Sequence, residues 1–292
     1  MDTHTFSNRA DGPVVVGTDG SAGAAPAVMW AAEEASARSR PLHIVHATDV
    51  HGWGGGMNAD VIRLILDAAP DLVEKAAEQA TGRFPELRAT TTVSQDSATA
   101  SLLQAAGNDG TVVVGSRGLG GFSALLLGSV GLSVVAHAQV PVVVVRNAER
   151  PSTGVVVVGV QDEADHDAVR FAAQTAGHRK ASLRLLSAWS FVQYVESMAP
   201  MVQAVWEAAE AEASVSTRII GSVRKEFPDL SVTADVARGA SPAGALVEAS
   251  SHADLLVVGT HKPTHPLGTA LGRVTHAVLH HAHCPVAVIP RG

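Results

Sequence analysis

Short runs of β-branched and aliphatic residues alternate with longer alanine-rich or amphipathic stretches along the whole chain. In the first half these runs predict strands at 13–17, 42–48, 88–94, 111–115 and 141–145. The stretches between them predict helices at 22–39, 58–82, 98–107 and 128–138. Near-continuous valine runs indicate strands that are buried on both faces, as in parallel sheets covered by helices. The pattern therefore predicts a doubly wound α/β fold.

The same series of elements occurs twice. Three segments of the first half recur 142 to 144 residues later: Val14–Gly17 as Val156–Gly159, Phe84–Leu87 as Phe227–Leu230, and Val113–Gly115 as Val257–Gly259. We therefore expect two tandem domains of the same fold, at residues 1–148 and 154–292.

A proline interrupts one of the predicted helices. Pro70 lies in the middle of the stretch 58–82. Proline lacks a backbone N–H, and its ring clashes with the preceding turn. We expect this helix to break or kink at Pro70.

Composition limits the classes of function. The chain is 46% hydrophobic and 17% charged, which is typical of packed domains. Residues 1–150 hold 10 basic and 15 acidic side chains, a net charge of −5, and the remainder holds 11 and 13, a net charge of −2. Neither half has the basic surplus that binding to a phosphate backbone requires, and aromatic residues make up only 4%. We expect no nucleic-acid partner.

The single cysteine and the polar first residues indicate a compartment. Cys284 has no second cysteine with which to form an internal disulfide, and residues 1–12 lack the apolar core of a signal peptide. The uncharged segment 118–145 is long enough for a membrane span, but His137 and Pro141 favour a helix followed by a buried strand. We expect a cytoplasmic protein without a membrane partner.

The strongest chemical signal follows the fourth predicted strand. Gly115-Ser-Arg-Gly118 is separated by nine residues from Gly128-Ser129, where the next helix is predicted to start. Glycines let the backbone approach a phosphate, and the unpaired N–H groups of a helix start are donors to anions. Arg117 adds a cation. The pattern predicts a phosphate site, although turn glycines remain the alternative interpretation.

Two further segments end at the same edge of the predicted sheet, where open α/β folds bind ligands. Asp19 follows the first strand, and its carboxylate is suited to a ribose hydroxyl or an adenine amino group. Asp19 is equally suited to capping the next helix. Residues 46–48 end the second strand, and their main-chain groups are suited to a base edge.

Other known chemistries find no support in the sequence. The phosphate motif lacks the Gly-Lys-Ser/Thr ending of a Walker loop, and it follows the fourth strand, whereas the dinucleotide-binding fingerprint follows the first. His280, His281, His283 and Cys284 are metal-ligand types, but they lie on both sides of a helix end, so we expect no metal site there. No nucleophile with a dedicated base appears, so we assign no catalytic residue.

The segment 14–21 together with the Gly-x2-Gly-x9-Gly-Ser motif resembles the ATP-binding class of universal stress proteins, and the duplication resembles their tandem-domain members in actinobacteria. The resemblance extends from about residue 12 to residue 290. It implies, for each domain, a five-stranded parallel sheet of order 3-2-1-4-5. It also implies a homodimer and a nucleotide-dependent stress-response regulator with at most slow ATP hydrolysis.

The resemblance implies the following ligand residues. Around adenine and ribose they are Gly17, Thr18, Asp19 and, through its main chain, Ala47. Around the ribose and phosphates they are Val114, Gly115, Gly118, Gly128, Ser129 and Val130. A magnesium or manganese ion that bridges the phosphates fits this chemistry.

The second half departs from the motif at three positions. Gln161 replaces the first-strand aspartate, Lys262 the second glycine, and Arg273 the hydroxyl residue. A side chain at 262 would intrude where backbone must approach a phosphate. We expect an empty or altered site in the second domain.

Two alternatives from other classes stay open. The first is an adenine-nucleotide α-hydrolase-type enzyme, although such enzymes show a Ser-Gly-Gly-x-Asp-Ser loop that the segment 17–21 lacks. The second is a nucleotide-free scaffold whose second half serves dimerisation.

Overall fold

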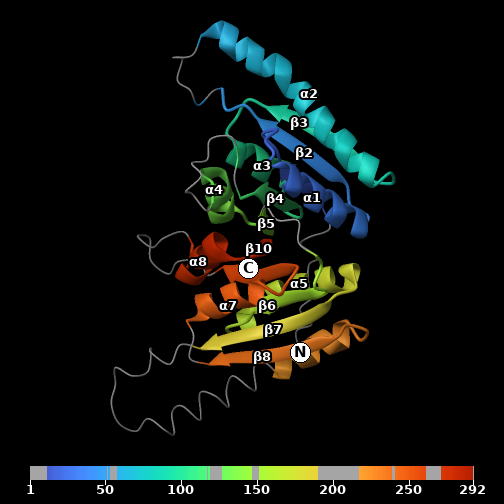
Figure 1. Ribbon diagram of the computed structural model, residues 1–292, viewed down its shortest axis with the longest axis vertical. Coiled ribbons are helices and arrows are strands. Elements are labelled where there is room, and N and C mark those ends of the chain that lie inside the picture. Colours follow the sequence, from blue (N-terminus) through green and yellow to red (C-terminus); the bar gives the residue numbers. More distant parts are fainter. Residues whose placement is uncertain are drawn as a thin grey trace. The chain divides into compact units, whose positions relative to one another are not determined.

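Valine-rich segments form the central strands of each of two units, Met1–Ala148 and Glu149–Gly292. The computed structural model describes residues 12–50, 52, 58–116, 118, 127–146, 151–189, 217–238, 241–260 and 271–291 (Figure 1). Within these ranges no helix is both long and apolar enough to cross a membrane.

The first unit is built on a parallel sheet. Its strands are β1 (Val14–Gly17), β2 (Leu42–Ala47), β3 (Ala89–Ser94), β4 (Thr111–Gly115) and β5 (Val142–Val145). They lie in the order β3-β2-β1-β4-β5, and each neighbouring pair is parallel. In the central strand, Val14 lies opposite Leu42 on one side and Thr111 on the other. Val14, Val15 and Val16 are fully buried because helices cover both faces.

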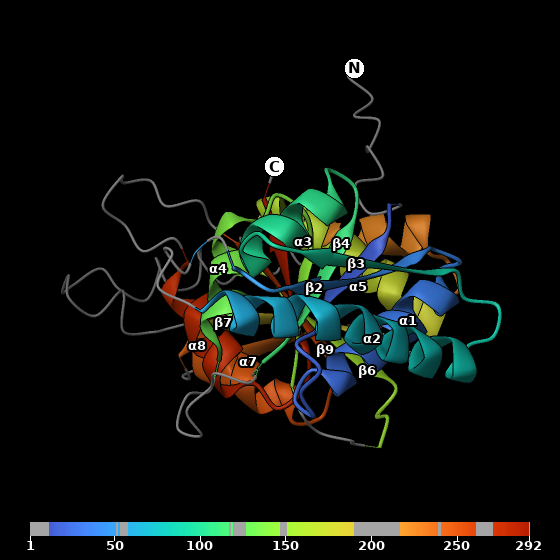
Figure 2. The same cartoon turned by 90° about the horizontal axis from the view of Figure 1, so that it is seen from above.

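The helices of the first unit are α1 (Ala25–Ala37), α2 (Ala59–Arg83), α3 (Ala98–Ala106) and α4 (Ser129–His137). α1 contacts α2, and these two helices together pack against β1 to β5, whereas α3 contacts α4 and packs on β1, β2 and β4. Figure 2 shows α1 and α2 on one face of the sheet and α3 and α4 on the other. The doubly wound α/β class predicted from the sequence is confirmed.

The expected break at Pro70 does not occur, and the alternative expectation of a kink stays a prediction. α2 runs as one helix from Ala59 to Arg83 with Pro70 inside it. Pro70 is exposed. The backbone carbonyl that loses its N–H partner to proline therefore lies on the solvent-exposed side of the helix. Buried residues on the opposite face (Ala69, Val73, Ala76 and Ala80) hold the helix against the sheet.

The second unit repeats the architecture. Its strands are β6 (Val155–Gly159), β7 (Ser182–Trp189), β8 (Val232–Arg238), β9 (Leu255–Thr260) and β10 (Val286–Pro290), in the parallel order β8-β7-β6-β9-β10. Its helices are the short η1 (Glu163–Asp165), α5 (His166–Arg179), α7 (Pro242–Ser250), α8 (Arg273–His281) and the segment 217–226. α5 packs on β6, β7, β9 and β10, and α7 contacts α8. Each repeated strand therefore takes the same place in both units.

Candidate functional site

The ends of β1 and β4 meet at one edge of the first unit. The two strands are neighbours, Gly17 ends β1, and Gly115 ends β4. From this edge the chain leaves β1 toward α1 on one face and leaves β4 toward α4 on the other face. Divergence of this kind opens space beyond the strand ends, which is where open α/β sheets bind ligands.

Asp19 shapes the turn after β1 and does not cap α1. Its Oδ1 atom accepts a hydrogen bond of 3.0 Å from the backbone N–H of Ser21. The residue before α1 is Ala24, whose N–H bonds to the Ser21 hydroxyl oxygen at 3.2 Å. Gly20 completes the turn with a φ of +74°, a conformation that favours glycine. The turn holds the Asp19 carboxylate at the edge of the sheet.

The second carboxylate oxygen of Asp19 lies against Gly118. A Cβ atom built on Gly118 would meet Asp19 Oδ2 at a distance shorter than real Cβ contacts allow. The absence of a side chain at 118 therefore lets the backbone after β4 lie directly on the carboxylate after β1. The fold thus brings together two parts of the expected site that are far apart in the sequence.

The loop after β4 is closed at its base by a residue that the sequence did not single out. The carbonyl of Ser116 accepts a hydrogen bond of 2.9 Å from the N–H of Gly128, and Ser116 itself is buried. Gly128 is the N-cap of α4 and gives it no side-chain cap. Ser129 and Val130 follow at the helix start and are exposed. Arg117 and residues 119–126 lie outside the described residues.

The end of β2 contributes main-chain groups and a histidine. The carbonyl of Val45 accepts a bond from the N–H of Thr18, and because strand residues alternate, the main-chain groups of Ala47 face the same side. That side holds the turn after β1. The Nδ1 atom of His46 donates to the carbonyl of Thr18 at 2.8 Å. The sequence pointed to the main chain here, whereas this side-chain contact of His46 was missed.

Not every expected site residue has an evident ligand role. A Cβ on Gly17 would lie 3.1 Å from Leu102 of α3, and a Cβ on Gly159 would lie 3.0 Å from Leu246 of α7. The repeated strand-end glycine therefore serves helix packing in both units. Thr18 and Val114 are both buried.

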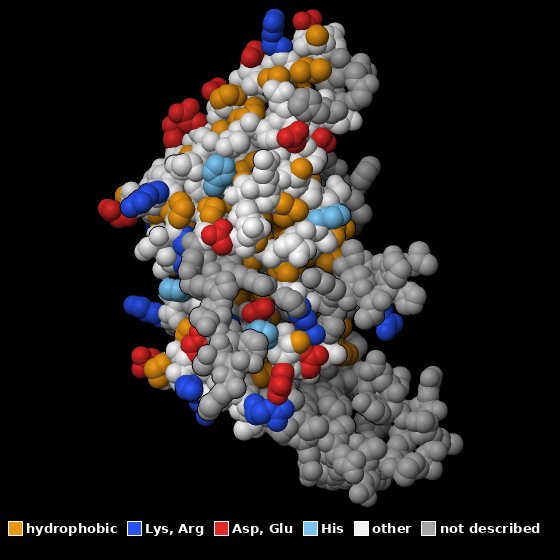
Figure 3. All heavy atoms as spheres, turned by 180° about the vertical axis from the view of Figure 1, so that it is seen from behind, with side chains coloured by type: hydrophobic (Ala, Val, Ile, Leu, Met, Phe, Trp, Pro, Cys, Tyr) orange, Lys and Arg blue, Asp and Glu red, His pale blue; other side chains and the backbone are white. Residues whose placement is uncertain are grey.

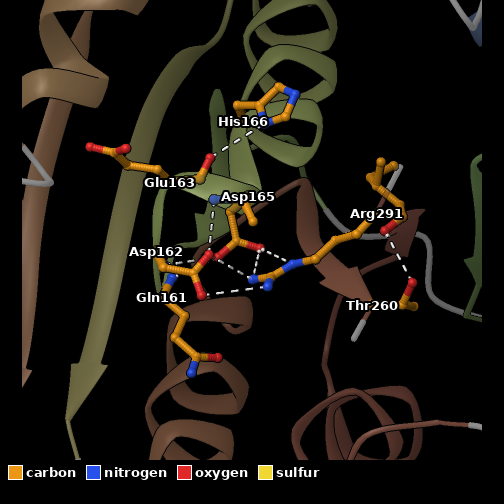
Figure 4. A network of polar contacts seen from close by, with 9 residues as sticks. Gln161, Asp162, Glu163, Asp165, His166, Thr260 and Arg291 are labelled. Atoms are coloured by element: carbon orange, nitrogen blue, oxygen red, sulfur yellow. Dashed lines mark hydrogen bonds and ion pairs between the residues drawn. The ribbon is translucent and has the colours of Figure 1, made fainter. Parts of the chain in front are cut away.

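The corresponding edge of the second unit differs. Gln161 stands in the place of Asp19, and its side chain points away from the neighbouring polar groups (Figure 4). Arg273 is the first residue of α8. Lys262 lies outside the described residues, so its expected intrusion remains a prediction.

Metal ligands and surface charge add two observations. The described parts of the chain contain no group of three or more His, Cys, Asp or Glu side chains placed to hold a metal ion.

On the face shown in Figure 3, the described Lys and Arg side chains lie singly or in small groups among Asp and Glu. The residues described on this face therefore form no extended basic patch.

Comparisons with known proteins agree with the two-unit architecture. The model of the universal stress protein family matches residues 12–146 and 153–290. A universal stress protein of Mycolicibacterium smegmatis is 32% identical over 291 residues, covering 94% of this chain and 96% of that protein. One from Mycobacterium tuberculosis is 31% identical with the same coverage.

A solved structure shows the same fold. The crystal structure of a universal stress protein from Archaeoglobus fulgidus superposes with a TM-score of 0.67, at 16% identity, over 97% of this chain and 99% of that one. Both the family match and the relatives extend over most of the chain. This chain therefore belongs to the universal stress protein family and carries one family domain in each half.

Proposed function

We propose that the first unit binds ATP at the edge formed by the ends of β1, β2 and β4. The observation that carries the proposal is that the Asp19 carboxylate occupies the space that a Cβ atom on Gly118 would need. The Asp19 carboxylate is suited to binding ribose hydroxyls. Next to it, the backbone at Gly118 has no side chain that would keep a phosphate away.

Each expected ligand residue has a part in this proposal. Gly17, Thr18 and Asp19 line the adenine and ribose, and Ala47 meets the base through its main chain. The ribose and phosphates are surrounded by Val114, Gly115, Gly118, Gly128, Ser129 and Val130.

The start of α4 supports the placement of the phosphates. Gly128 caps the helix without a side-chain hydrogen bond, so the N–H groups of the first turn point outward from a helix N-terminus. Such donors favour a phosphate, and the helix dipole adds to the attraction. A magnesium or manganese ion bound by the phosphates would neutralise part of their charge.

The proposed role is regulation and not fast chemistry. Asp19 is the one carboxylate among the proposed ligand residues, and its Oδ1 already accepts the Ser21 N–H. No other acidic or basic side chain stands among these residues to serve as a general base, so we propose that hydrolysis is at most slow. We propose a cytoplasmic, homodimeric stress-response regulator whose state depends on bound nucleotide.

Isothermal titration calorimetry with MgATP tests the proposal. Asp19→Ala should weaken ATP binding by roughly tenfold or more, since a charge-assisted hydrogen bond is lost. Gln161→Ala, the matched change in the second unit, should leave the affinity unchanged. Absence of ATP binding to the wild-type protein would overturn the function, and unchanged binding to Asp19→Ala would overturn the site.

A further inference from the structure

The loop after β6 carries a carboxylate where the first unit carries a glycine. Six residues after the strand-end glycine stand Gly23 in the first unit and Asp165 in the second. Asp165 is only 3% exposed. Its Oδ2 atom accepts hydrogen bonds from the N–H groups of Gln161 at 2.7 Å and Asp162 at 3.3 Å. Consecutive N–H groups that converge in this way form an anion site, and here the anion belongs to the chain itself.

An arginine neutralises this carboxylate. Arg291, which follows β10, lies with Nη2 at 2.7 Å and Nε at 3.2 Å from Asp165 Oδ1. Nη2 also lies 3.3 Å from Asp162 Oδ1. The Arg291 side chain is 14% exposed, and Figure 4 shows it directed at both carboxylates. A buried pair of this kind resists separation, because removal of one partner leaves an uncompensated charge.

The pair lies directly on the end of β9, the strand that corresponds to β4. A Cβ atom on Gly259 would lie 2.5 Å from Asp165 Oδ1 and 3.4 Å from Arg291 Nε. Asp165 and Arg291 therefore fill the space over the ends of β6 and β9. In the first unit, the equivalent space is where the phosphates of a nucleotide are proposed to lie.

We propose that the Asp165–Arg291 pair is an internal substitute for a bound anion and closes the second unit to phosphate ligands. An external phosphate would have to displace a buried carboxylate from two N–H groups and break its ion pair. Removal of the carboxylate turns the same loop into an anion site, with Arg291 as its cation. The proposal goes beyond ATP binding by the first unit, and only the choice of phosphate as the excluded ligand rests on that proposed function.

Hydrogen–deuterium exchange with peptide resolution tests this closure, with inorganic pyrophosphate at millimolar concentration as the probe. In the wild-type protein, pyrophosphate should leave exchange in peptides covering 155–166 and 255–260 unchanged. In Asp165→Ala it should slow exchange in these peptides by roughly threefold or more, because the freed N–H groups and Arg291 now bind the probe. The double variant Asp165→Ala/Arg291→Gln, which lacks the cation, should lose this response.

Two results overturn the proposal: protection of the second-unit peptides in the wild-type protein, or no gain of protection in folded Asp165→Ala. Exchange in the first-unit peptides with ATP, read in the same experiment, reports the proposed function separately.

A second measurement covers the case in which Asp165→Ala does not fold. Arg291→Gln should lower the melting temperature by roughly 5–10 °C, since it leaves a buried carboxylate unpaired. Arg218→Gln breaks a pair of 2.7 Å with Glu163 in which both side chains are more than half exposed. It should lower the melting temperature by less than about 2 °C. Equal effects of the two changes would overturn the closure.

Discussion

The Asp19 carboxylate occupies the space that a Cβ atom at position 118 would need. Asp19 follows β1, Gly118 follows β4, and the pairing of these two strands brings the residues together. The carboxylate is also held from its own turn, by the N–H of Ser21. A substitution at Asp19 or Gly118 should therefore alter the position of the other residue.

Gly118→Ala should weaken ATP binding by roughly tenfold or more, because the new Cβ displaces the Asp19 carboxylate. The double variant Asp19→Ala/Gly118→Ala should lose less affinity than the sum of the two single losses, since the carboxylate that the new methyl group would displace is already gone. Calorimetry on the three variants measures this coupling. Strictly additive losses would contradict the proposed role of the contact.

Gly82 provides the matched control for a glycine-to-alanine change. It lies inside α2, and a Cβ there would meet no heavy atom within 4 Å. Gly82→Ala should raise the free energy of unfolding by about 0.5–1 kcal/mol through helix propensity, with ATP binding unchanged. Urea denaturation and calorimetry measure the two effects.

The fold was predictable because its signals are local. The valine runs of β1 and β4 gave strands within one residue of the observed bounds, since burial on both faces needs continuous apolar sequence. Pro70 does not break α2, because tertiary packing of the Ala69–Ala80 face outweighs one lost hydrogen bond on an exposed surface.

The site was predictable only in part. Asp19 and Gly118 carry recognisable residue types, but the contact between them depends on strand pairing. Arg291 and Asp165 are 126 residues apart. Asp165 forms a local capping box with Asp162, and this motif does not predict a pair with Arg291. Gly17 matched a ligand motif, yet the structure adds a packing reason for the glycine that the motif does not contain.

His46 should act as a positioning residue of the proposed ATP site. Its Nδ1–H group holds the Thr18 carbonyl, and this bond fixes the turn that carries Asp19. His46→Leu should weaken ATP binding by roughly threefold to tenfold, and His46→Asn, which keeps an N–H donor, should recover part of the loss.

His43 is the control for this change. It lies on the same strand, and its Nδ1 contacts Thr90 of β3, away from the turn. His43→Leu should leave ATP affinity unchanged in calorimetry. An equal loss of affinity in His43→Leu and His46→Leu would show that the effect comes from β2 as a whole.

Gly17 should be intolerant of a side chain for reasons of packing. Gly17→Ala places a methyl group 3.1 Å from Leu102 Cδ1 in a buried interface between β1 and α3. The free energy of unfolding should fall by about 1–3 kcal/mol, as for other overpacked cores. Leu102→Val in the same chain should return part of this loss, as measured by urea denaturation. A double variant less stable than both single variants would argue against a steric cause.

Asp254, which directly precedes β9, holds the segment before β6 in place. Its carboxylate accepts hydrogen bonds from the N–H groups of Thr153 at 2.6 Å and Gly154 at 2.8 Å, and from the hydroxyls of Ser152 at 2.7 Å and Thr153 at 3.0 Å. Partial burial acts to raise the pKa of Asp254, but these hydrogen bonds outweigh it and hold the pKa below its ordinary value of 3.8.

A lowered pKa in the folded state makes the contribution of Asp254 depend on pH in a defined direction. The stabilisation is fully present above the unfolded-state pKa of about 3.9 and is lost as the pH falls through the lower folded-state value. Asp254→Asn should cost about 1–2 kcal/mol at pH 7, since the amide nitrogen cannot accept the remaining bonds. Urea denaturation at pH 6 and pH 3 should show a smaller acid loss in Asp254→Asn than in the wild-type protein. Identical losses in the two proteins would mean that other carboxylates govern acid unfolding.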